Sequence, residues 1–224
     1  MKKRIQRVRE RIAHAASRAG RDPTAVTLIG ATKGVDAALV REAFAAGLLD
    51  FGENRVQEAS DKIAAVGPGP RWHFIGHVQH NKARIVAGTF ETIHSIHSPR
   101  IAQTLDRAAR VAGRRLRVLI EVNVAGEPTK YGVAPSAVGP LLAGVRSLKH
   151  LDPVGLMTIA PLVDDPEIVR PVFRRLRELR DQLRGREGGE RLTELSMGMS
   201  GDFEVAVEEG ATIVRIGRAI FGER

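Results

Sequence analysis

The stretch VTLIGATKGVDAALVREAFAAGLLDFGEN, residues 26–54, contains two short apolar segments on either side of an amphipathic one. Residues 26–31 and 48–52 have the apolar composition of buried strands. The segment between them carries apolar residues at helical spacing, and Asp36 can cap its first turn. The stretch therefore predicts a strand, a helix and a second strand, which is the repeating unit of a parallel α/β fold.

The same alternation continues along the rest of the chain. Further strands are expected at 72–76, 91–96, 116–124, 153–159, 193–197 and 212–217. Helices are expected at 55–66, 80–87, 98–113, 135–147 and 166–184, with a short one after Ser200 and an extra amphipathic one that ends near Gly20. Eight strands separated by helices, with no break in composition, predict a single (β/α)₈ barrel domain over residues 1–224 with an extra N-terminal helix.

A doubly wound open sheet is the alternative fold. Such sheets usually have fewer strands, and the first strand-to-helix turn lacks the Gly-x-Gly-x-x-Gly fingerprint of dinucleotide-binding proteins. The barrel is therefore the preferred prediction.

Composition restricts the protein's class. The formal net charge is +9, which suits either a phosphate-rich partner or a surface of solvated arginines. The arginines are scattered along the expected helices and aromatic residues make up only 4%, so no nucleic-acid partner is expected. The chain has no cysteine, no membrane-length apolar stretch and no signal peptide, which together predict a cytosolic protein without membrane association. The absence of a heptad pattern or an apolar surface stripe favours a monomer.

Unusual side chains follow or end several of the expected strands. They are Lys33, Asn54, His77, Asn123, Met157, Ser200 and Arg215. In a (β/α)₈ barrel the carboxyl ends of the strands meet at one rim and carry the chemistry. The pattern therefore predicts a site at that rim.

Lys33 is the most informative of these residues. Because it comes just after a buried strand, burial could lower the pKa of its amine and make it a nucleophile toward carbonyls. The alternative is a lysine that extends from a strand end into water or pairs with a carboxylate such as Glu53. Lys62, by contrast, has an ordinary place on a helix face. Position alone leaves both interpretations of Lys33 open.

Arg215 and Ser200 suggest an anion site. A guanidinium within the apolar segment 212–217 must find an acceptor or point out of the barrel, and the next residues, Gly217 and Arg218, could offer backbone amides to an anion. Ser200 at the start of a short helix is either a simple N-cap or a hydroxyl directed at a phosphate.

Other catalytic motifs are missing. The chain has no Walker A sequence, no His-Glu-x-x-His and no Gly-x-Ser-x-Gly. His73, His77 and His80 surround a strand-to-helix turn without a carboxylate at ligand spacing, so no metal is expected. His94 and His97 are interpreted as strand-end and loop residues.

Seven stretches give the sequence a specific family resemblance. They are ATK (31–33), DFGENRVQEASDKI (50–63), WHFIGHVQHNK (72–82), VNVAGEPTKYG (122–132), GLMTI (155–159), LSMGMSGDFEVAVEEGAT (195–212) and VRIGRAIFG (214–222). In this order they resemble the pyridoxal-phosphate homeostasis proteins, which share the alanine racemase-type barrel. The resemblance covers nearly the whole chain.

The resemblance implies pyridoxal 5′-phosphate (PLP) bound as an aldimine on Lys33. By analogy with the racemase barrel, it places the phosphate at Ser200, Gly217 and the amide of Arg218, and the pyridine nitrogen opposite Arg215. The remaining pocket residues would be Asn54, His77, Asn123 and Met157. The chain departs from the family at Val35, where a second lysine is common, and at Arg55 and His80, where tyrosine and serine are common.

Two functions fit this resemblance. The first is a PLP carrier that buffers the cofactor or delivers it to apoenzymes, without established catalysis. The second is a small PLP-dependent amino-acid racemase or lyase. Racemisation needs acid–base groups on both faces of the cofactor plane. Lys33 could serve one face, but the chain's only tyrosine, Tyr131, is expected in a loop and no second group is evident. An arginine opposite the ring nitrogen would also weaken the electron sink. The carrier is therefore the preferred prediction.

Overall fold

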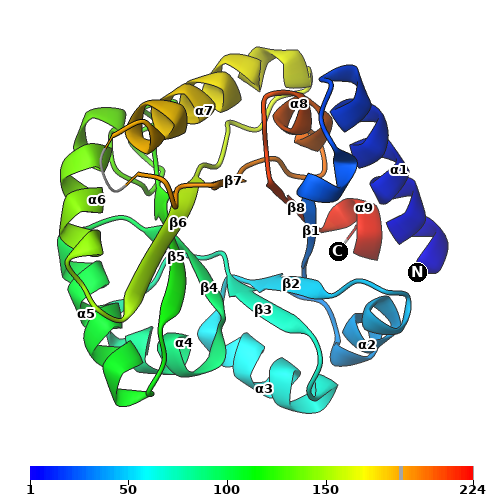
Figure 1. The fold of residues 1–224 in the computed structure, drawn as a ribbon. Coiled ribbons are helices and arrows are strands. Elements are labelled where there is room, and N and C mark those ends of the chain that lie inside the picture. The colour runs from blue at the N-terminus through cyan, green and yellow to red at the C-terminus, as the bar shows by residue number, and fades with distance from the viewer. Residues whose placement is uncertain (187–188, 224) are drawn as a thin grey trace.

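The protein is a closed barrel of eight parallel strands (Figure 1). A computed structural model describes residues 1–186 and 189–223. The strands are β1 (Thr27–Ala31), β2 (Asp50–Glu53), β3 (Arg71–Phe74), β4 (Thr92–Ile96), β5 (Leu116–Glu121), β6 (Leu151–Met157), β7 (Glu194–Ser196) and β8 (Ile213–Ile216). Each strand pairs with its neighbour in sequence, and β8 closes the ring by pairing Leu28 with Val214. The predicted (β/α)₈ barrel is confirmed.

Helices surround this barrel. They are α1 (Lys2–Arg18), α2 (Ala37–Ala45), α3 (Val56–Val66), α4 (Ala83–Thr89), α5 (Pro99–Val111), α6 (Val138–Arg146), α7 (Arg170–Arg184), α8 (Phe203–Glu208) and α9 (Arg218–Phe221). Short 3₁₀ helices precede β1 (Pro23–Ala25), α4 (His80–Lys82), α6 (Pro135–Ala137) and α7 (Pro166–Val169). No helix in the described part of the chain is long and apolar enough to cross a membrane.

The additional N-terminal helix α1 is also confirmed. It lies against α8 and α9 on the outside of the barrel (Figure 1). Its buried face consists of Ile5, Val8 and Ile12 with two alanines. On its outer face Arg18 forms an ion pair with Glu208 at 2.7 Å. The helix therefore covers the part of the ring where β8 meets β1.

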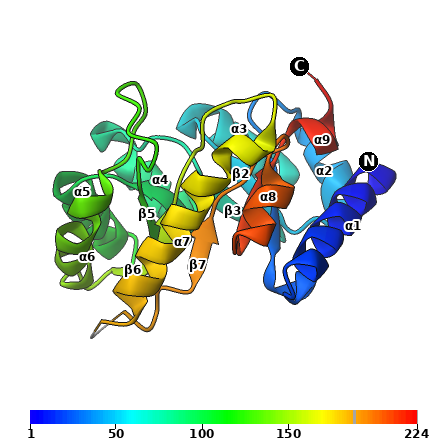
Figure 2. The same cartoon turned by 90° about the horizontal axis from the view of Figure 1, so that it is seen from above.

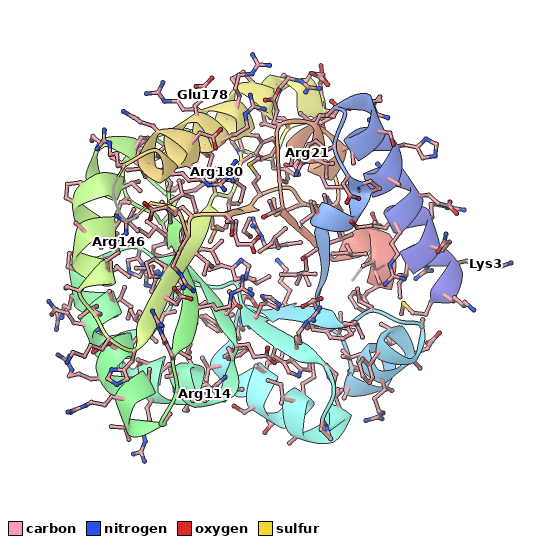
Figure 3. The ribbon with its side chains drawn as sticks, in the orientation of Figure 1. Lys3, Arg21, Arg114, Arg146, Glu178 and Arg180 are labelled. Atoms are coloured by element: carbon pink, nitrogen blue, oxygen red, sulfur yellow. The ribbon has the colours of Figure 1, made fainter. Side chains whose placement is uncertain are left out.

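Side chains fill the interior of the ring, as Figure 3 shows. Every residue of β2, β4, β6 and β8 is buried, as expected for parallel strands covered by helices. Several of these buried residues are polar. His94, which was expected at a strand end, instead lies in the middle of β4 and is fully buried. The barrel core therefore contains more polar groups than the apolar pattern indicates.

The loops at the carboxyl ends of the strands share one side of the barrel. In Figure 2 the loop after β5 and the loop after β6 rise on the same side as α9 and the C-terminus. This is the side on which (β/α)₈ barrels place their binding sites.

Candidate functional site

A cavity of about 670 Å³ opens at the carboxyl ends of the strands. Seven of the predicted site residues line it: Lys33, Asn54, His77, Ser200, Arg215, Gly217 and Arg218. They come from the ends of β1, β2, β3, β7 and β8, so the barrel brings together residues that are up to 185 positions apart. The volume is within the range of about 300–1,000 Å³ that is typical of small-molecule sites.

Lys33 reaches this cavity from the turn after β1, but its side chain is exposed rather than buried. Gly34, with φ +65°, allows the turn, which Val35 closes by donating its amide hydrogen to Thr32 O at 2.9 Å. Among the described residues no hydrogen bond or ion pair involves the Lys33 amine. The argument from burial therefore does not hold for Lys33.

Lys62 is the buried lysine, which corrects its assignment to an ordinary helix face. Its Nζ lies 2.5 Å from Glu53 Oε1 and 2.9 Å from Glu58 Oε1, and it donates to Thr32 O. Burial raises the pKa of Glu53, against the opposing effect of Lys62. Glu58 Oε1 also accepts from Gly34 N at 2.5 Å. Glu53 thus pairs with Lys62 rather than with Lys33, and the group as a whole supports the backbone on both sides of Lys33.

Arg215 is buried and points into the barrel, where its guanidinium helps to line the cavity. Its Nη1 donates to Ser196 Oγ at 2.6 Å and its Nη2 to Thr158 O at 2.9 Å. Burial lowers the pKa of Arg215 to about 10, so the group remains a cation at neutral pH. The sequence-based requirement that this arginine find an acceptor is met by two neutral oxygens.

Asn54 and His77 form another part of the wall. Asn54 Oδ1 and His77 Nδ1 are buried without a hydrogen-bond partner among the described residues. Burial, with a smaller effect of His97, lowers the pKa of His77. Gly76 allows the close approach of these two loops, because a Cβ there would lie 2.4 Å from Asn54 O. The two orphaned atoms are available to a bound ligand.

Ser200 lies beside the start of α9, where Ala219 N donates to its Oγ at 3.4 Å. The expectation that Ser200 begins the following helix is wrong, because α8 begins at Phe203 and its N-cap is Asp202. Ser200, Gly217 and the exposed Arg218 instead meet at one edge of the cavity. The Ser200 hydroxyl, the backbone at Gly217 and the cationic side chain of Arg218 are groups that suit the binding of an anion.

Asn123 and Met157 have different roles. In the described chain neither residue is part of the cavity wall. The Asn123 side chain holds its own loop, since Nδ2 donates to Glu127 O at 2.8 Å and Oδ1 accepts from Glu127 N at 3.1 Å. Met157 is fully buried and packs with Leu119 and Val154. Their expected place on the pocket wall is therefore not found.

Two residues missed as site groups line the cavity. Tyr131, on the loop after β5, stacks on His77 with ring centroids 3.9 Å apart. Glu121 is 5% exposed, its Oε2 has no partner among the described residues, and burial raises its pKa to about 7. The signal for Glu121 was a carboxylate directly after the apolar run 118–120 in β5. No second acid–base group was evident from the sequence, and the structure places these two ionisable side chains in the cavity wall.

The described residues contain no group of three or more histidine, cysteine, aspartate or glutamate side chains that could hold a metal ion. His73 instead contacts His94 inside the barrel, whereas His77 and His97 stack at the rim with centroids 4.4 Å apart.

Comparisons with known proteins agree with this architecture. The family model described as alanine racemase, N-terminal domain, matches residues 4–224. The pyridoxal phosphate homeostasis protein of Aquifex aeolicus is 48% identical over 222 residues, which are 99% of this chain and 97% of the relative. The protein of the same name from Pseudomonas aeruginosa is 45% identical over 98% of this chain and 94% of its own length.

A solved structure gives the same result. The structure of PipY from Synechococcus elongatus with PLP bound superposes with a TM-score of 0.83 at 39% identity, and the match covers 94% of this chain and all of that one. The residues matched by the family model, 4–224, include all eight strands. The chain belongs to the family of pyridoxal phosphate homeostasis proteins, within the wider family defined by the alanine racemase N-terminal domain.

Proposed function

We propose that this protein binds PLP in the cavity at the carboxyl ends of the strands and buffers the cofactor or delivers it to apoenzymes. The observation that carries the proposal is the Lys33 amine, which has no partner among the described residues and shares one cavity with the buried Arg215. The names of the relatives and the PLP-bound relative support it. The whole chain, 1–224, is proposed to act as a single PLP-binding domain.

The cavity has groups suited to each part of this cofactor. PLP supplies an aldehyde with which a primary amine condenses, with loss of water. Lys33 is the amine that can reach it, and Ser200, Gly217 and Arg218 provide donors for the phosphate. Arg215 offers a charged donor to the ring nitrogen. The orphaned Asn54 Oδ1 and His77 Nδ1 are free for the ring substituents, whereas Asn123 and Met157 act indirectly, through the loop and the core behind the wall.

An absorbance titration with PLP tests the binding. The wild-type protein is expected to develop the visible band of a lysine-bound cofactor with one equivalent of PLP. Lys33→Ala is expected to lose the band, whereas Lys149→Ala, which removes an exposed loop lysine, keeps it. An unchanged band in Lys33→Ala contradicts the proposal.

Delivery is tested by transfer. The loaded protein, mixed with the apo form of a PLP enzyme, is expected to restore that enzyme's activity while its own visible band declines. The control repeats the experiment with free PLP in place of the loaded protein, and both reactions contain an excess of an amine that traps released PLP. If the loaded protein restores the activity no faster than free PLP does, direct delivery is excluded and only buffering remains.

A second function, racemase or lyase, gains support from Glu121 and Tyr131 because both line the cavity. It predicts exchange of the α-proton of an amino acid in D₂O by the loaded protein, lost in Glu121→Gln or Tyr131→Phe. If the α-proton is retained during incubation with the loaded wild-type protein, the carrier function stands without catalysis. The apoenzyme partners, the monomeric state and the cytosolic location stay predictions.

A further inference from the structure

A chain of hydrogen-bonded side chains crosses the barrel from the floor of the cavity. Arg215 Nη1 lies 2.6 Å from Ser196 Oγ, and that oxygen lies 2.9 Å from His94 Nδ1. His94 Nε2 lies 3.0 Å from His73 Nδ1, and His73 Nε2 lies 3.1 Å from Asp50 Oδ1. The five residues come from β8, β7, β4, β3 and β2, and all are buried. The chain connects the cavity to the opposite end of the barrel.

The far end of the chain is an ionised carboxylate. Asp50 is the first residue of β2, and its two oxygens accept from Arg71 Nε at 2.8 Å and Nη2 at 2.6 Å. Burial alone would raise the pKa of Asp50, but hydrogen bonds from His73 and Arg71 outweigh it and lower the pKa to about 2. Arg71 is 52% exposed, so this end contacts solvent through a cation.

The ionised end determines the direction of every hydrogen bond. A carboxylate only accepts, so His73 Nε2 donates to Asp50. In a neutral His73 ring Nδ1 is then an acceptor, which requires His94 Nε2 to donate. Burial lowers the pKa of His94 well below its usual value, so this ring is neutral and its Nδ1 accepts from the Ser196 hydroxyl. The Ser196 oxygen in turn accepts from Arg215.

The reverse direction is less favourable. It requires a doubly protonated His73 and therefore a second buried cation in a barrel that already contains Arg215. It also leaves the Ser196 proton without an acceptor among the described partners, because Arg215 and His94 would both donate to its oxygen. The single direction toward Asp50 satisfies every group.

We propose that Asp50, His73, His94 and Ser196 are positioning residues that hold the Arg215 guanidinium aimed at the cavity. Among the described residues its hydrogen-bond acceptors are two neutral oxygens, Ser196 Oγ and Thr158 O. The carboxylates of Asp202 and Glu121 favour its charged form through their charge. Hydrogen bonds that point along one chain polarise one another, so the distant carboxylate strengthens the last acceptor. The link to PLP rests on the proposed function, whereas the chain itself does not.

The first test uses the wild-type protein without cofactor. Side-chain ¹⁵N–¹H correlation spectra at neutral pH are expected to show His73 and His94 as neutral rings, each with its proton on Nε2. A His94 ring protonated on Nδ1, or a cationic His73, overturns the proposed direction and with it the proposal.

The second test breaks the chain at its two ends. Asp50→Asn removes the charge far from the cavity, and Ser196→Ala removes the acceptor of Arg215. In Ser196→Ala the loss of a hydrogen bond to the buried, charged Arg215 predicts an increase of about tenfold in the dissociation constant for PLP. Asp50→Asn weakens that bond only through the chain and predicts a smaller increase. Both variants are also expected to shift the pH dependence of the visible band, because that band responds to charge beside the ring. Ser196→Thr keeps the hydroxyl and is expected to restore both properties.

Two controls separate positioning from general destabilisation. Leu176→Ala opens the buried face of α7 outside the barrel, and His80→Asn changes an exposed histidine. Neither is expected to shift the pH dependence of the band.

The outcomes distinguish the two proposals. If the wild-type protein binds no PLP, the proposed function fails and the tautomers still decide the direction of the chain. If it binds PLP and both Asp50→Asn and Ser196→Ala leave affinity and pH dependence unchanged, positioning fails while the proposed function stands. A variant that does not fold leaves the decision to the tautomers.

Discussion

The structure reverses the burial that the sequence indicates for two lysines, Lys33 and Lys62. Lys33 follows a buried strand but is exposed, and Lys62 lies on a helix but is buried against Glu53. A lysine is buried only where a partner offsets the loss of its hydration. That partner is set by how α3 packs against β2, which the local pattern does not contain. The exposed and the buried lysine can therefore be distinguished only in the folded barrel.

Lys62→Met tests the structural lysine. The substitution leaves Glu53 and Thr32 O without their buried cation, and breaking a buried pair is expected to cost about 3–5 kcal/mol of unfolding free energy. Urea unfolding measures the loss, with Lys149→Met as the exposed control. The double variant Lys62→Met/Glu53→Gln is expected to recover part of it. A Lys62→Met protein as stable as the control contradicts the account.

Glu121 makes stability depend on pH. Its pKa is raised by burial from the usual value near 4.5 to about 7, so the folded protein binds a proton that the unfolded chain releases. The protonated form folds without penalty, and stability falls as pH rises from about 4.5 to about 7. Glu121→Gln is therefore expected to be more stable than the wild type at pH 8, by up to about 3 kcal/mol, and nearly equal to it near pH 4. Thermal unfolding at the two pH values measures this, and a constant difference contradicts it.

At the scale of elements, much of the barrel could be predicted from the sequence. The helix α5 is an example, since Ser98 caps it by accepting from Ile101 N at 3.3 Å and Pro99 occupies its first position, as expected. The strands were predicted from runs of apolar residues, and this criterion does not indicate polar side chains inside the barrel. His73 and His94 stand next to apolar neighbours, and only the closed barrel brings their rings together.

The loop after β5 could not be predicted in the same way. Asn123 closes it through bonds to Glu127, and Asn123 N donates to Val133 O at 2.9 Å. These contacts place Tyr131 over His77 and turn Asn123 away from the pocket. A loop fold built from its own backbone bonds leaves no periodic signal in the sequence.

Gly132→Ala is expected to disrupt this loop. Gly132 has φ +105°, and a Cβ there would lie 2.8 Å from Asn123 N. The substitution is expected to destabilise the protein by about 1–3 kcal/mol and to accelerate hydrogen exchange at the amides of Asn123 and Val133. Gly144→Ala, in the exposed part of α6 with open space around it, is the matched control and is expected to be neutral or stabilising. Equal exchange in the two variants contradicts the role of Gly132.

At the scale of the whole molecule, many arginines are already paired. Glu209 forms ion pairs with Arg170, Arg174 and Arg177, with N···O distances of 2.9–3.3 Å. These pairs join α7 to the end of α8 across the outside of the barrel. In the sequence the arginines behind the net charge of +9 are scattered along the chain, and one carboxylate pairs with three of them.

This arrangement predicts no specific binding of nucleic acid. Fluorescence anisotropy with labelled DNA and RNA oligonucleotides at about 150 mM salt is expected to show no saturable binding. Saturable binding that weakens steeply with added salt, and that persists in Lys33→Ala, contradicts this interpretation of the charge.

The central claim is that the exposed Lys33 amine holds PLP. The most direct test incubates the protein with PLP, reduces the mixture with borohydride and maps the modified peptides by mass spectrometry. The account predicts one phosphopyridoxyl group per chain, on Lys33, with Lys62 unmodified because it is buried in its ion pairs. A protein that carries no adduct on Lys33, or carries it equally on exposed lysines such as Lys149, contradicts the account.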